Sequence, residues 1–467
     1  MISLKDIQTL FFLGIGGIGM SALARYFHRL GCAVSGYDRT PSVLTKELEQ
    51  EGIKIIYDDD PKLFGISVCS RQNLVIVRTP AVPEDSALYT YFREQNLPIC
   101  KRSELLGLVT RSMKALCVAG THGKTTTSTM LAHLLNENGD LQEPKGVNAF
   151  LGGISMNYST NVLIDPQSDL VVVEADEYDR SFHRLTPYIS VVTAVDADHL
   201  DIYGTPEAYR DAFAHYTSLI TNALVMKHGL DLQPRLQPGV KCYTYDVQTP
   251  AHPANGADFY ADHIRVGEGR IVFDLVTPAT VVKDIRLGVP VWVNIENAVA
   301  AMTVALLSGV PAEHLRARMA SFKGVQRRFN IHVHTPKVVY IDDYAHHPQE
   351  IATAIDSIRK LFPERRLVGV FQPHLFTRTR DFAPEFKRVL HTMDELILLP
   401  IYPAREEPIE GVTSEMLGGQ VVEKADLVAV LKEKVQQSQE PLVILTVGAG
   451  DIDRLVQPIA EQLASLQ

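Results

Sequence analysis

Two short apolar segments of this chain each run directly into a glycine-rich turn and then into a helical pattern. The first is TLFFLGIGGIGMSALARYFHRL (residues 9–30), and the second is MKALCVAGTHGKTTTSTMLAHLL (residues 113–135). A strand, a glycine turn and a helix in this order form the phosphate-binding corner of parallel α/β folds, because the turn backbone and the first helix amides face the phosphate. Two such corners predict two parallel sheets and two phosphate sites.

The first turn has the spacing G-x-G-x-x-G of a dinucleotide-binding loop. The residues expected to bind there are Gly14, Gly16, Gly17, Ile18 and Gly19. Asp38 ends the next predicted strand, AVSGYD, where a carboxylate can accept a ribose hydroxyl. The loop predicts a binding site for a nucleotide or nucleotide-sugar but does not indicate which nucleotide. The alternative is a turn that serves only the packing of the strand and helix.

The second turn predicts an ATP site. Its backbone amides can surround phosphates, Lys124 can reach the terminal phosphate, and the Thr125 hydroxyl can bind Mg²⁺. Val118 stands where the common P-loop has its first glycine, so the loop is a variant of the form G-T-x-G-K-T-T. The expected ATP-binding residues are Gly120, Thr121, His122, Gly123, Lys124, Thr125 and Thr126.

Acidic residues follow the next two apolar strands, LVVVEADEYD and VVTAVDADHLD. Glu174 is the first polar residue after its strand and is the best candidate for Mg²⁺, which prefers oxygen ligands. The other acidic residues of the two segments either bind metal or serve as helix caps and solvated groups: Asp176, Glu177, Asp179, Asp196, Asp198 and Asp201. His199 is either a metal ligand or a histidine satisfied within its turn.

Later motifs suggest further contacts. Asn294 and Asn297 stand at a predicted helix start, where they either cap the helix or bind adenine. Arg327 and Arg328, in GVQRRFN, are either solvated or reach an ATP phosphate.

Two loops in the last third of the chain carry the remaining candidates. DDYAHHP lacks the H-E-x-x-H spacing of zinc sites, and its aspartates predict a ribose or magnesium-phosphate contact. QPHLFTRTR offers His374, Arg378 and Arg380 to an acidic substrate group.

Composition limits the class of protein. A chain of 467 residues is too long for one typical domain. The pattern of predicted strands, helices and turns changes near residues 107 and 326, which predicts domains 1–107, 108–326 and 327–467. Strand-like runs between about 240 and 290 predict an antiparallel patch inserted in the middle domain. A net charge of -10 argues against a general nucleic-acid binder. Five scattered cysteines and no long apolar span predict a cytoplasmic protein that does not cross a membrane.

The ordered motifs GTHGKTT, EADE, DADHLD, NIENA, GVQRRF, DDYAHHP and QPHLFTRT resemble those of the Mur ligases. The resemblance runs from about residue 10 to Asp451. It implies an α/β fold of three domains: a Rossmann-like UDP-substrate domain, a central P-loop ATPase-like domain and a C-terminal Rossmann-like domain. It also implies that the first loop binds the diphosphate of a UDP-sugar rather than NAD.

The same resemblance implies ATP-dependent joining of L-alanine to the lactyl carboxylate of UDP-N-acetylmuramate, through an acyl phosphate, in peptidoglycan synthesis. The cofactors implied are ATP and one or two Mg²⁺ ions, for which Mn²⁺ can substitute, and the chain is expected as a monomer or homodimer. The roles implied are adenine for Asn294 and Asn297, ribose for Asp343, the transferring phosphate for Arg327 or Arg328, a second magnesium for His199, and the alanine carboxylate for His347, His374 and Arg378.

One position departs from the family pattern. Mur ligases of this type commonly read Q-P-H-R-Y-T-R-T, whereas this chain has Leu375 and Phe376, so one arginine beside the amino-acid site is missing. Glycine or L-serine could then be accepted as well as L-alanine, because a pocket discriminates weakly by one small group. Three alternatives remain: a murein-recycling tripeptide ligase on the same UDP-sugar, an NAD-dependent oxidoreductase, and a non-catalytic nucleotide-binding protein.

Overall fold

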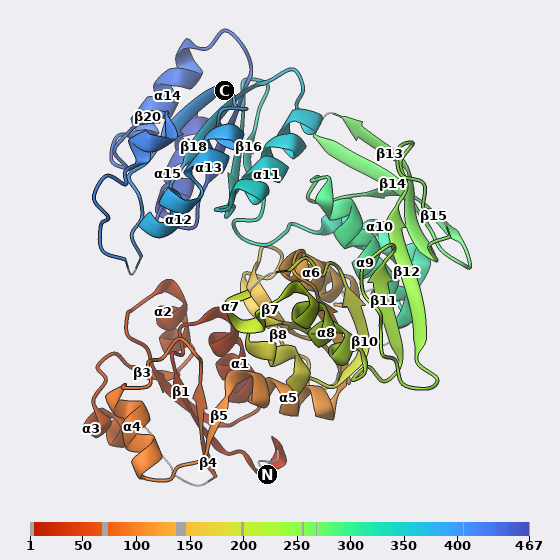
Figure 1. Cartoon of the computed structure of the whole chain (residues 1–467), viewed down its shortest axis with the longest axis vertical. Coiled ribbons are helices and arrows are strands. Elements are labelled where there is room, and N and C mark those ends of the chain that lie inside the picture. Colours follow the sequence, from red (N-terminus) through yellow and green to blue (C-terminus); the bar gives the residue numbers. More distant parts are fainter. Residues whose placement is uncertain are drawn as a thin grey trace. The chain divides into compact units, whose positions relative to one another are not determined.

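The computed structural model describes residues 4–67, 73–136, 146–197, 200–254, 256–267, 269–404 and 406–466. The chain divides into two compact units (Figure 1). The first unit consists of Met1–His263, Asp274–Ile285 and Glu296–Phe322, and the second of Ile264–Phe273, Arg286–Ile295 and Lys323–Gln467. Within the described ranges, no helix combines the length and apolarity that a bilayer span requires.

The N-terminal sheet of the first unit is a five-stranded parallel sheet of order β3-β2-β1-β4-β5. Its strands are β1 (Thr9–Leu13), β2 (Ala33–Tyr37), β3 (Lys54–Ile56), β4 (Leu74–Arg78) and β5 (Ile99–Lys101). The helices of this region are α1 (Ile18–Arg29), α2 (Val43–Gln50), α3 (Pro61–Ser67), α4 (Ala87–Glu94) and α5 (Arg102–Ser112). The strand order reverses at β1, so the glycine loop after β1 lies at the switch point where open α/β sheets bind ligands.

A ten-stranded sheet forms the rest of the first unit's framework, in the order β15-β14-β13-β12-β11-β10-β6-β9-β7-β8. Its strands are β6 (Lys114–Ala119), β7 (Asn148–Ser155), β8 (Thr160–Leu163), β9 (Leu170–Ala175), β10 (Pro187–Val192), β11 (Ala223–Lys227), β12 (Lys241–Val247), β13 (Phe259–Gly267), β14 (Arg270–Val276) and β15 (Val281–Arg286). Strand β6 pairs in parallel with both β10 and β9, so the second glycine loop also leaves the carboxyl end of a central strand.

The prediction of an antiparallel patch between residues 240 and 290 is wrong for the first strands of that segment. Strand β12 pairs in parallel with β11, and β13 pairs in parallel with β12, so these strands extend the same sheet. The chain reverses between β13 and β14 through a turn too short for a parallel crossover, so antiparallel pairing begins only there. Figure 1 shows this extension running from β10 and β11 to β15.

The helices that accompany the large sheet carry most of the site. They are α6 (Lys124–Leu135), α7 (Leu200–Tyr203), α8 (Pro206–Thr217), α9 (Val293–Leu307) and α10 (Ala312–Ser321), together with the 3-10 segment η2 (Tyr178–Arg184). Helix α6 begins directly at the phosphate loop and is buried from Thr127 to Leu135. The sheet order therefore brings the β9 carboxylates beside the start of α6.

The second unit contains a six-stranded sheet of order β16-β17-β21-β18-β19-β20, parallel except for the edge strand β16. Its strands are β16 (Asn330–His334), β17 (Val338–Asp343), β18 (Arg366–Phe371), β19 (Glu395–Leu398), β20 (Gln420–Val421) and β21 (Leu442–Val447). Its helices are α11 (Pro348–Leu361), α12 (Phe376–Asp381), α13 (Ala383–Leu390), α14 (Leu427–Gln437) and α15 (Asp453–Ala464). The predicted α/β class with parallel-rich sheets is confirmed.

Candidate active site

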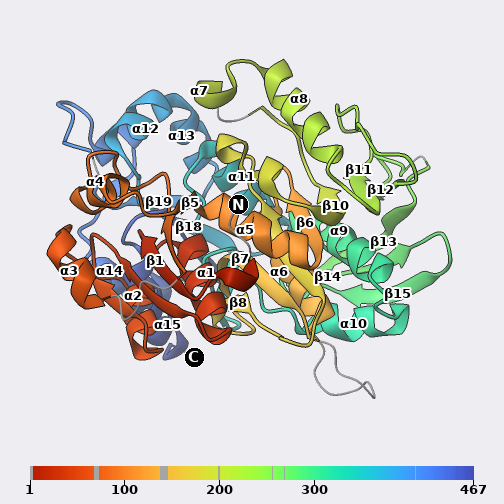
Figure 2. The same ribbon diagram turned by 90° about the horizontal axis from the view of Figure 1, so that it is seen from below.

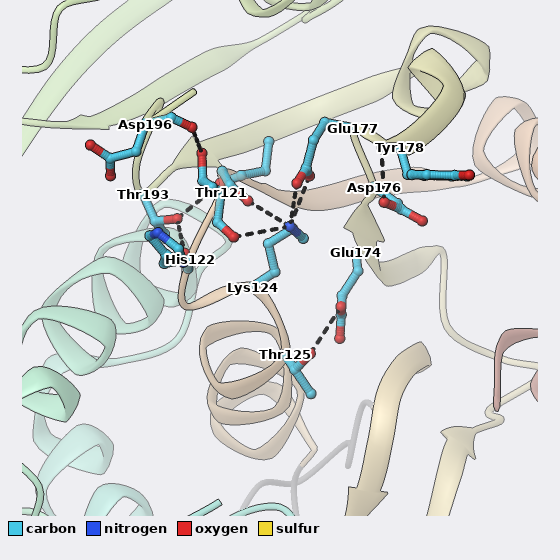
Figure 3. Close-up of polar contacts among 12 residues, drawn as sticks. Thr121, His122, Lys124, Thr125, Glu174, Asp176, Glu177, Tyr178, Thr193 and Asp196 are labelled. Atoms are coloured by element: carbon cyan, nitrogen blue, oxygen red, sulfur yellow. Dashed lines mark hydrogen bonds and ion pairs between the residues drawn. The ribbon is translucent and has the colours of Figure 1, made fainter. Parts of the chain in front are cut away.

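The phosphate loop has the backbone geometry that its glycines predict. Gly120 and Gly123 have φ angles of 133° and 81°, which side chains rarely allow, and α6 begins at Lys124. A Cβ on Gly123 would lie 2.6 Å from Asn297 Oδ1. Thr121 fastens the loop, since its hydroxyl donates to the Asp196 carbonyl at 2.8 Å (Figure 3). The loop is thus held in a fixed shape with the helix amides at its end.

Lys124 is enclosed by oxygen atoms. Its Nζ donates to both carboxylate oxygens of Glu177, at 2.9 and 2.8 Å, and to the Gly120 carbonyl at 2.7 Å (Figure 3). The Glu177 side chain is only 3% exposed and that of Lys124 17%. Burial raises the pKa of Glu177, and the nearby ammonium opposes that effect. The cation expected to meet a phosphate is therefore neutralised by a buried carboxylate.

Glu174 and Thr125 meet as the magnesium prediction requires. The Thr125 hydroxyl donates to Glu174 Oε2 at 3.1 Å, and the Ser128 hydroxyl donates to Oε1 at 3.1 Å. The Gly152 amide donates to the same Oε1 at 2.7 Å. Burial raises the pKa of the Glu174 carboxyl, so a bound cation would compensate a charge that burial disfavours. This hydroxyl and carboxylate are hard oxygen donors that fit Mg²⁺.

The acidic residue beside the N-terminal glycine loop, Asp38, contacts the backbone of that loop, and its ribose role stays a prediction. The Gly16 amide donates to Asp38 Oδ2 at 2.8 Å, and a Cβ on Gly16 would lie 2.8 Å from the same oxygen. Gly14 has a φ of 82° and would clash with Thr79 if it carried a side chain. Asp38 therefore braces the loop, and Gly16 is required because the carboxylate lies against it.

Helix α1, which follows this loop, is fixed by a residue of the large sheet. Asn161 of β8 donates from Nδ2 to the Ile18 carbonyl at 2.6 Å and to the Ser21 hydroxyl at 3.0 Å. Its Oδ1 accepts from Arg25 Nη1 at 2.7 Å. Arg25 also pairs with Glu47 and Glu51 of the α2 region. Figure 2 shows α1 beside β7 and β8. Asn161 thereby ties the start of α1 to the neighbouring sheet.

One cavity of about 410 Å³ is lined by both loops. The glycine loop contributes Gly17 to Gly19, and the lining also includes Lys124 and Glu174. Arg102 and Asp176 also line it, and both take part in a neighbouring cavity of about 330 Å³. A ligand held at the glycine loop can therefore extend toward the phosphate loop without leaving the cavity.

The carboxylates after β9 each have a cationic partner. Asp176 pairs with Arg102 at 3.4 Å, and Asp179 pairs with Lys101 at 2.8 Å. Asp179 has a φ of 52°, as the chain turns sharply after β9. Asp176 also accepts from the Tyr178 amide at 3.1 Å, at the start of η2, as the capping alternative predicts. The metal-binding alternative for these carboxylates stays a prediction.

The two asparagines of α9 are both buried. Asn297 accepts at Oδ1 from the Thr127 hydroxyl at 3.2 Å, beside the phosphate loop. Asn294 donates from Nδ2 to the Val289 carbonyl at 3.2 Å. The helix begins at Val293, so the expectation that Asn294 is its N-cap is wrong, and it lies in the first turn instead. The adenine role stays a prediction for both.

In the second unit, Arg327 and Asp343 are held within their own sheet. Arg327 pairs with the buried Asp342 at 3.2 Å and donates to the Gly448 carbonyl at 2.7 Å. Asp343 accepts from the Phe329 and Ala345 amides at 2.8 and 2.7 Å. Burial raises the pKa of Asp343 to about 6. Arg328 is exposed, with its guanidinium over the Tyr344 ring, so it is the arginine more open to a ligand.

Of the three residues predicted to bind the alanine carboxylate, two contact each other and the third caps a helix. His374 Nδ1 and Arg378 Nη1 lie 3.4 Å apart, and the His374 ring stacks on Tyr402. His347 accepts from the Gln349 amide and caps α11. Leu375 has a φ of 71°, a conformation that costs energy for a leucine. The unusual residue of this loop is therefore also a strained one.

The second-magnesium prediction falls on His199, which, like Asp198, lies outside the described residues. Among the described part of the chain, no group of three or more His, Cys, Asp or Glu side chains is arranged to hold a metal. Arg102, Asn161 and Gly152 were missed by sequence reasoning. Of these three residues, only Arg102 could have been found from the sequence, because it directly follows the carboxyl end of a strand, β5.

Two strand–glycine-turn–helix corners, on sheets that are mostly parallel, line one cavity. This arrangement is typical of α/β proteins that bind nucleotides. Family profiles match three consecutive parts of the chain: "Mur ligase family, catalytic domain" matches residues 9–113, "Mur ligase middle domain" residues 118–305 and "Mur ligase, glutamate ligase domain" residues 327–450. The chain belongs to the Mur ligase family, a family of ligases.

Curated relatives cover nearly the whole chain. The UDP-N-acetylmuramate–L-alanine ligase of Parabacteroides distasonis is 51% identical over 466 residues, 99% of this chain and 98% of the relative. That of Porphyromonas gingivalis is 49% identical over 469 residues, 98% of this chain and 100% of the relative.

Solved structures agree. UDP-N-acetylmuramate-alanine ligase MurC of Thermotoga maritima matches with a TM-score of 0.78 at 27% identity, covering 98% of this chain and 100% of that one. A murein peptide ligase of Psychrobacter arcticus matches with a TM-score of 0.65 at 20% identity, covering 98% of this chain and 99% of that one, and this likeness shows the fold alone.

Proposed function

We propose that this chain joins L-alanine to the lactyl carboxylate of UDP-N-acetylmuramate at the expense of ATP, as a step of peptidoglycan synthesis. The observation that carries the proposal is the cavity that the glycine loop lines together with Lys124 and Glu174. A UDP-sugar held by its diphosphate at the glycine loop can direct its carboxylate toward an ATP γ-phosphate at the phosphate loop. Relatives near 50% identity that are named for L-alanine support this acceptor.

The residues fit the chemistry of such a ligase. A carboxylate acylates poorly, so its oxygen first attacks the γ-phosphorus, ADP leaves, and an acyl phosphate forms. The alanine amine then attacks the acyl carbon, and phosphate leaves from the tetrahedral intermediate. Because anions must approach one another, positioning and charge neutralisation supply most of the catalysis. Lys124 binds the γ-phosphate, which replaces Glu177 as its partner.

Mg²⁺ would be held by Thr125 and Glu174, with His199 as the predicted ligand of a second ion, and it supplies positive charge against the γ-phosphate. Asn294 and Asn297 are assigned to adenine and Asp343 to ribose. Arg327 or Arg328 is assigned to the transferring phosphate, and His347, His374 and Arg378 to the alanine carboxylate.

We also propose a division into three working domains near residues 107 and 326, although residue 107 lies inside α5 and the family matches change near 113–118. The proposed enzyme acts in the cytoplasm, as a monomer or homodimer.

Phosphate release by the purified chain with ATP, Mg²⁺ and UDP-N-acetylmuramate tests the proposal. Parallel reactions contain L-alanine, L-serine, glycine, the L-alanyl-γ-D-glutamyl-meso-diaminopimelate tripeptide or no acceptor, and mass spectrometry identifies each product. Release and a UDP-muramoyl-alanine mass with L-alanine support the proposal. Turnover with the tripeptide alone would show that the chain is a murein-recycling tripeptide ligase. No turnover with any acceptor contradicts a ligase role for this site.

A further inference from the structure

The cavity between the two loops contains a second cation, Arg102, to which none of the roles above assigns a task. Arg102 is the first residue of α5 and follows β5 directly. The α5 start is fixed by Glu104, whose carboxylate accepts from the Lys101 amide at 2.9 Å. The backbone at Arg102 is therefore set, and its side chain lines both cavities.

The Arg102 side chain lies along the start of α1. A Cβ built on Gly19 would lie 3.0 Å from Arg102 Nη1 and 3.3 Å from its Cδ. A side chain at the third glycine of the G-x-G-x-x-G spacing would therefore have to displace the arginine slightly. The guanidinium is brought beside the amide end of a helix, which already favours anions.

The guanidinium is held loosely. Asp176 Oδ2 lies 3.4 Å from Nη2, at the long end of hydrogen-bond distances, and the Asp176 carboxylate is 41% exposed. Among the described residues this is the ion pair that Arg102 forms. A guanidinium has five N–H donors in a planar fork that matches phosphate oxygens, so most of its donors remain for a ligand.

We propose that Arg102 binds the diphosphate of the nucleotide-sugar at the glycine loop, with Asp176 as the residue that orients it. This inference rests on the proposed function. Arg102 lies beside Gly19 of the glycine loop, and Lys124 and Glu174 line the same cavity. A sugar nucleotide that spans the cavity therefore places its diphosphate beside Arg102 and its carboxylate near Lys124. The guanidinium supplies a charge that the neutral amides of the loop lack.

Calorimetric titration of UDP and of UDP-N-acetylmuramate into wild type, Arg102→Met and Arg102→Lys tests the inference. Arg102→Met is expected to weaken both ligands by about 10- to 100-fold, the range for losing charge-assisted hydrogen bonds. Arg102→Lys keeps the charge without the fork and should fall between. MgATP affinity should stay within about twofold, since Lys124 binds that ligand. Arg111→Met, an exposed arginine in the last turn of the same helix, is the matched control.

The outcomes separate the two proposals. If wild type forms product and Arg102→Met binds UDP as tightly as wild type, the diphosphate assignment is overturned while the ligase function stands. Weakening of UDP-N-acetylmuramate without weakening of UDP would move Arg102 to the lactyl carboxylate and also overturn it. If wild type binds UDP through Arg102 but forms no product with any acceptor, the proposed function fails and the diphosphate site remains. Unchanged thermal unfolding of the variants shows that their fold is intact.

Discussion

Lys124 and Glu177 form a two-pronged ion pair, with Nζ at 2.9 and 2.8 Å from the two carboxylate oxygens. The carboxylate is almost fully buried, so it depends on this cation for its charge. The lysine has two tasks in consequence: it supports the folded state, and in the proposed reaction it binds phosphate.

Comparing Lys124→Ala with the double variant Lys124→Ala/Glu177→Gln separates the effect of Lys124 on stability from its effect on phosphate binding. The single variant is expected to lose ADP formation by roughly 100- to 1000-fold, as when a main electrostatic contact to a transition state is removed. It should also lose about 2 kcal/mol of stability because a buried carboxylate is left unpaired. The double variant should regain the thermal stability but not the rate. Recovery of ADP formation by the double variant would contradict the phosphate role of Lys124.

Gly152→Ala should disturb the magnesium position. The new Cβ would lie 2.5 and 2.6 Å from the Glu174 carboxylate oxygens, so that carboxylate must move or lose the Gly152 amide. We expect the Mg²⁺ concentration for half-maximal activity to rise by about tenfold, in line with changes around metal ligands. A magnesium titration of phosphate release measures this. Gly65→Ala, in a helix with open space at the Cβ position, should behave as wild type; an unchanged magnesium requirement in Gly152→Ala would argue against Glu174 as a ligand.

Asp343 should make stability fall as pH rises between about 4 and 6. Burial raises its folded-state pKa to about 6, above that of an aspartate in the unfolded chain. In this window the folded state retains a proton that the unfolded state has lost, so the free energy of unfolding decreases with increasing pH and then levels off. Urea unfolding of wild type and Asp343→Asn across pH 4.5 to 7.5 checks the sign. The free energy of unfolding of the variant should increase relative to that of wild type as pH rises to about 6. If the two free energies change in parallel with pH, the raised pKa is refuted.

Asn161→Ala should loosen the start of α1. It leaves the Ile18 carbonyl, the Ser21 hydroxyl and one Arg25 nitrogen without their partner in a buried place. The expected loss is about 2–3 kcal/mol, the cost of unsatisfied buried polar groups. Thermal and urea unfolding measure it against Gln167→Ala, an exposed change expected within about 0.5 kcal/mol of wild type. Equal stability of the two variants would show that other groups replace Asn161.

Leu375→Arg introduces the arginine of the family pattern Q-P-H-R-Y-T-R-T. If the loop otherwise binds the alanine carboxylate, KM for L-alanine should fall by about tenfold or more, as expected for one added charge-assisted hydrogen bond. Leu375→Gly is the control for the backbone, because glycine tolerates the φ of 71° and adds no charge, so that KM should not change. A KM unaffected by the arginine would mean that the substrate is held elsewhere.

The strands and both glycine loops could be predicted because each is a local pattern. TLFFL and KALCVA are short apolar runs followed at once by glycine and a helix, and the structure has strands at these positions. Strands β7 and β8 could not be predicted in the same way, because β7 pairs in parallel with the sequence-distant β9 and contains two glycines. The extension of the sheet by β12 also depends on a long-range pairing that no local pattern encodes.

Site prediction was limited by side chains whose partners are distant in sequence. The neighbourhood of Thr125 and Glu174 follows from the rule on strand ends, and the structure brings the two together. That Glu177 pairs with Lys124, and Asp38 with the Gly16 amide, could not be read from spacing, since an acidic residue at a strand end serves a ligand and a loop equally well. Asn161 gave no signal at all because its partners are more than a hundred residues away.

Each cation at the cavity wall already has a carboxylate of its own, Glu177 for Lys124 and Asp176 for Arg102. The contact of Asp176 with Arg102 is long, at 3.4 Å, whereas Glu177 contacts Lys124 through both of its oxygens. Glu177 is therefore a tethered competitor for Lys124, with an effective concentration that a small anion in solution does not reach. A lone phosphate or sulfate gains one contact and must displace such a competitor, whereas a ligand that also engages a glycine loop, a sugar pocket or a base pocket can do so. In the proposed ligase, this competition disfavours a lone anion at Lys124 relative to a nucleotide that binds at several points.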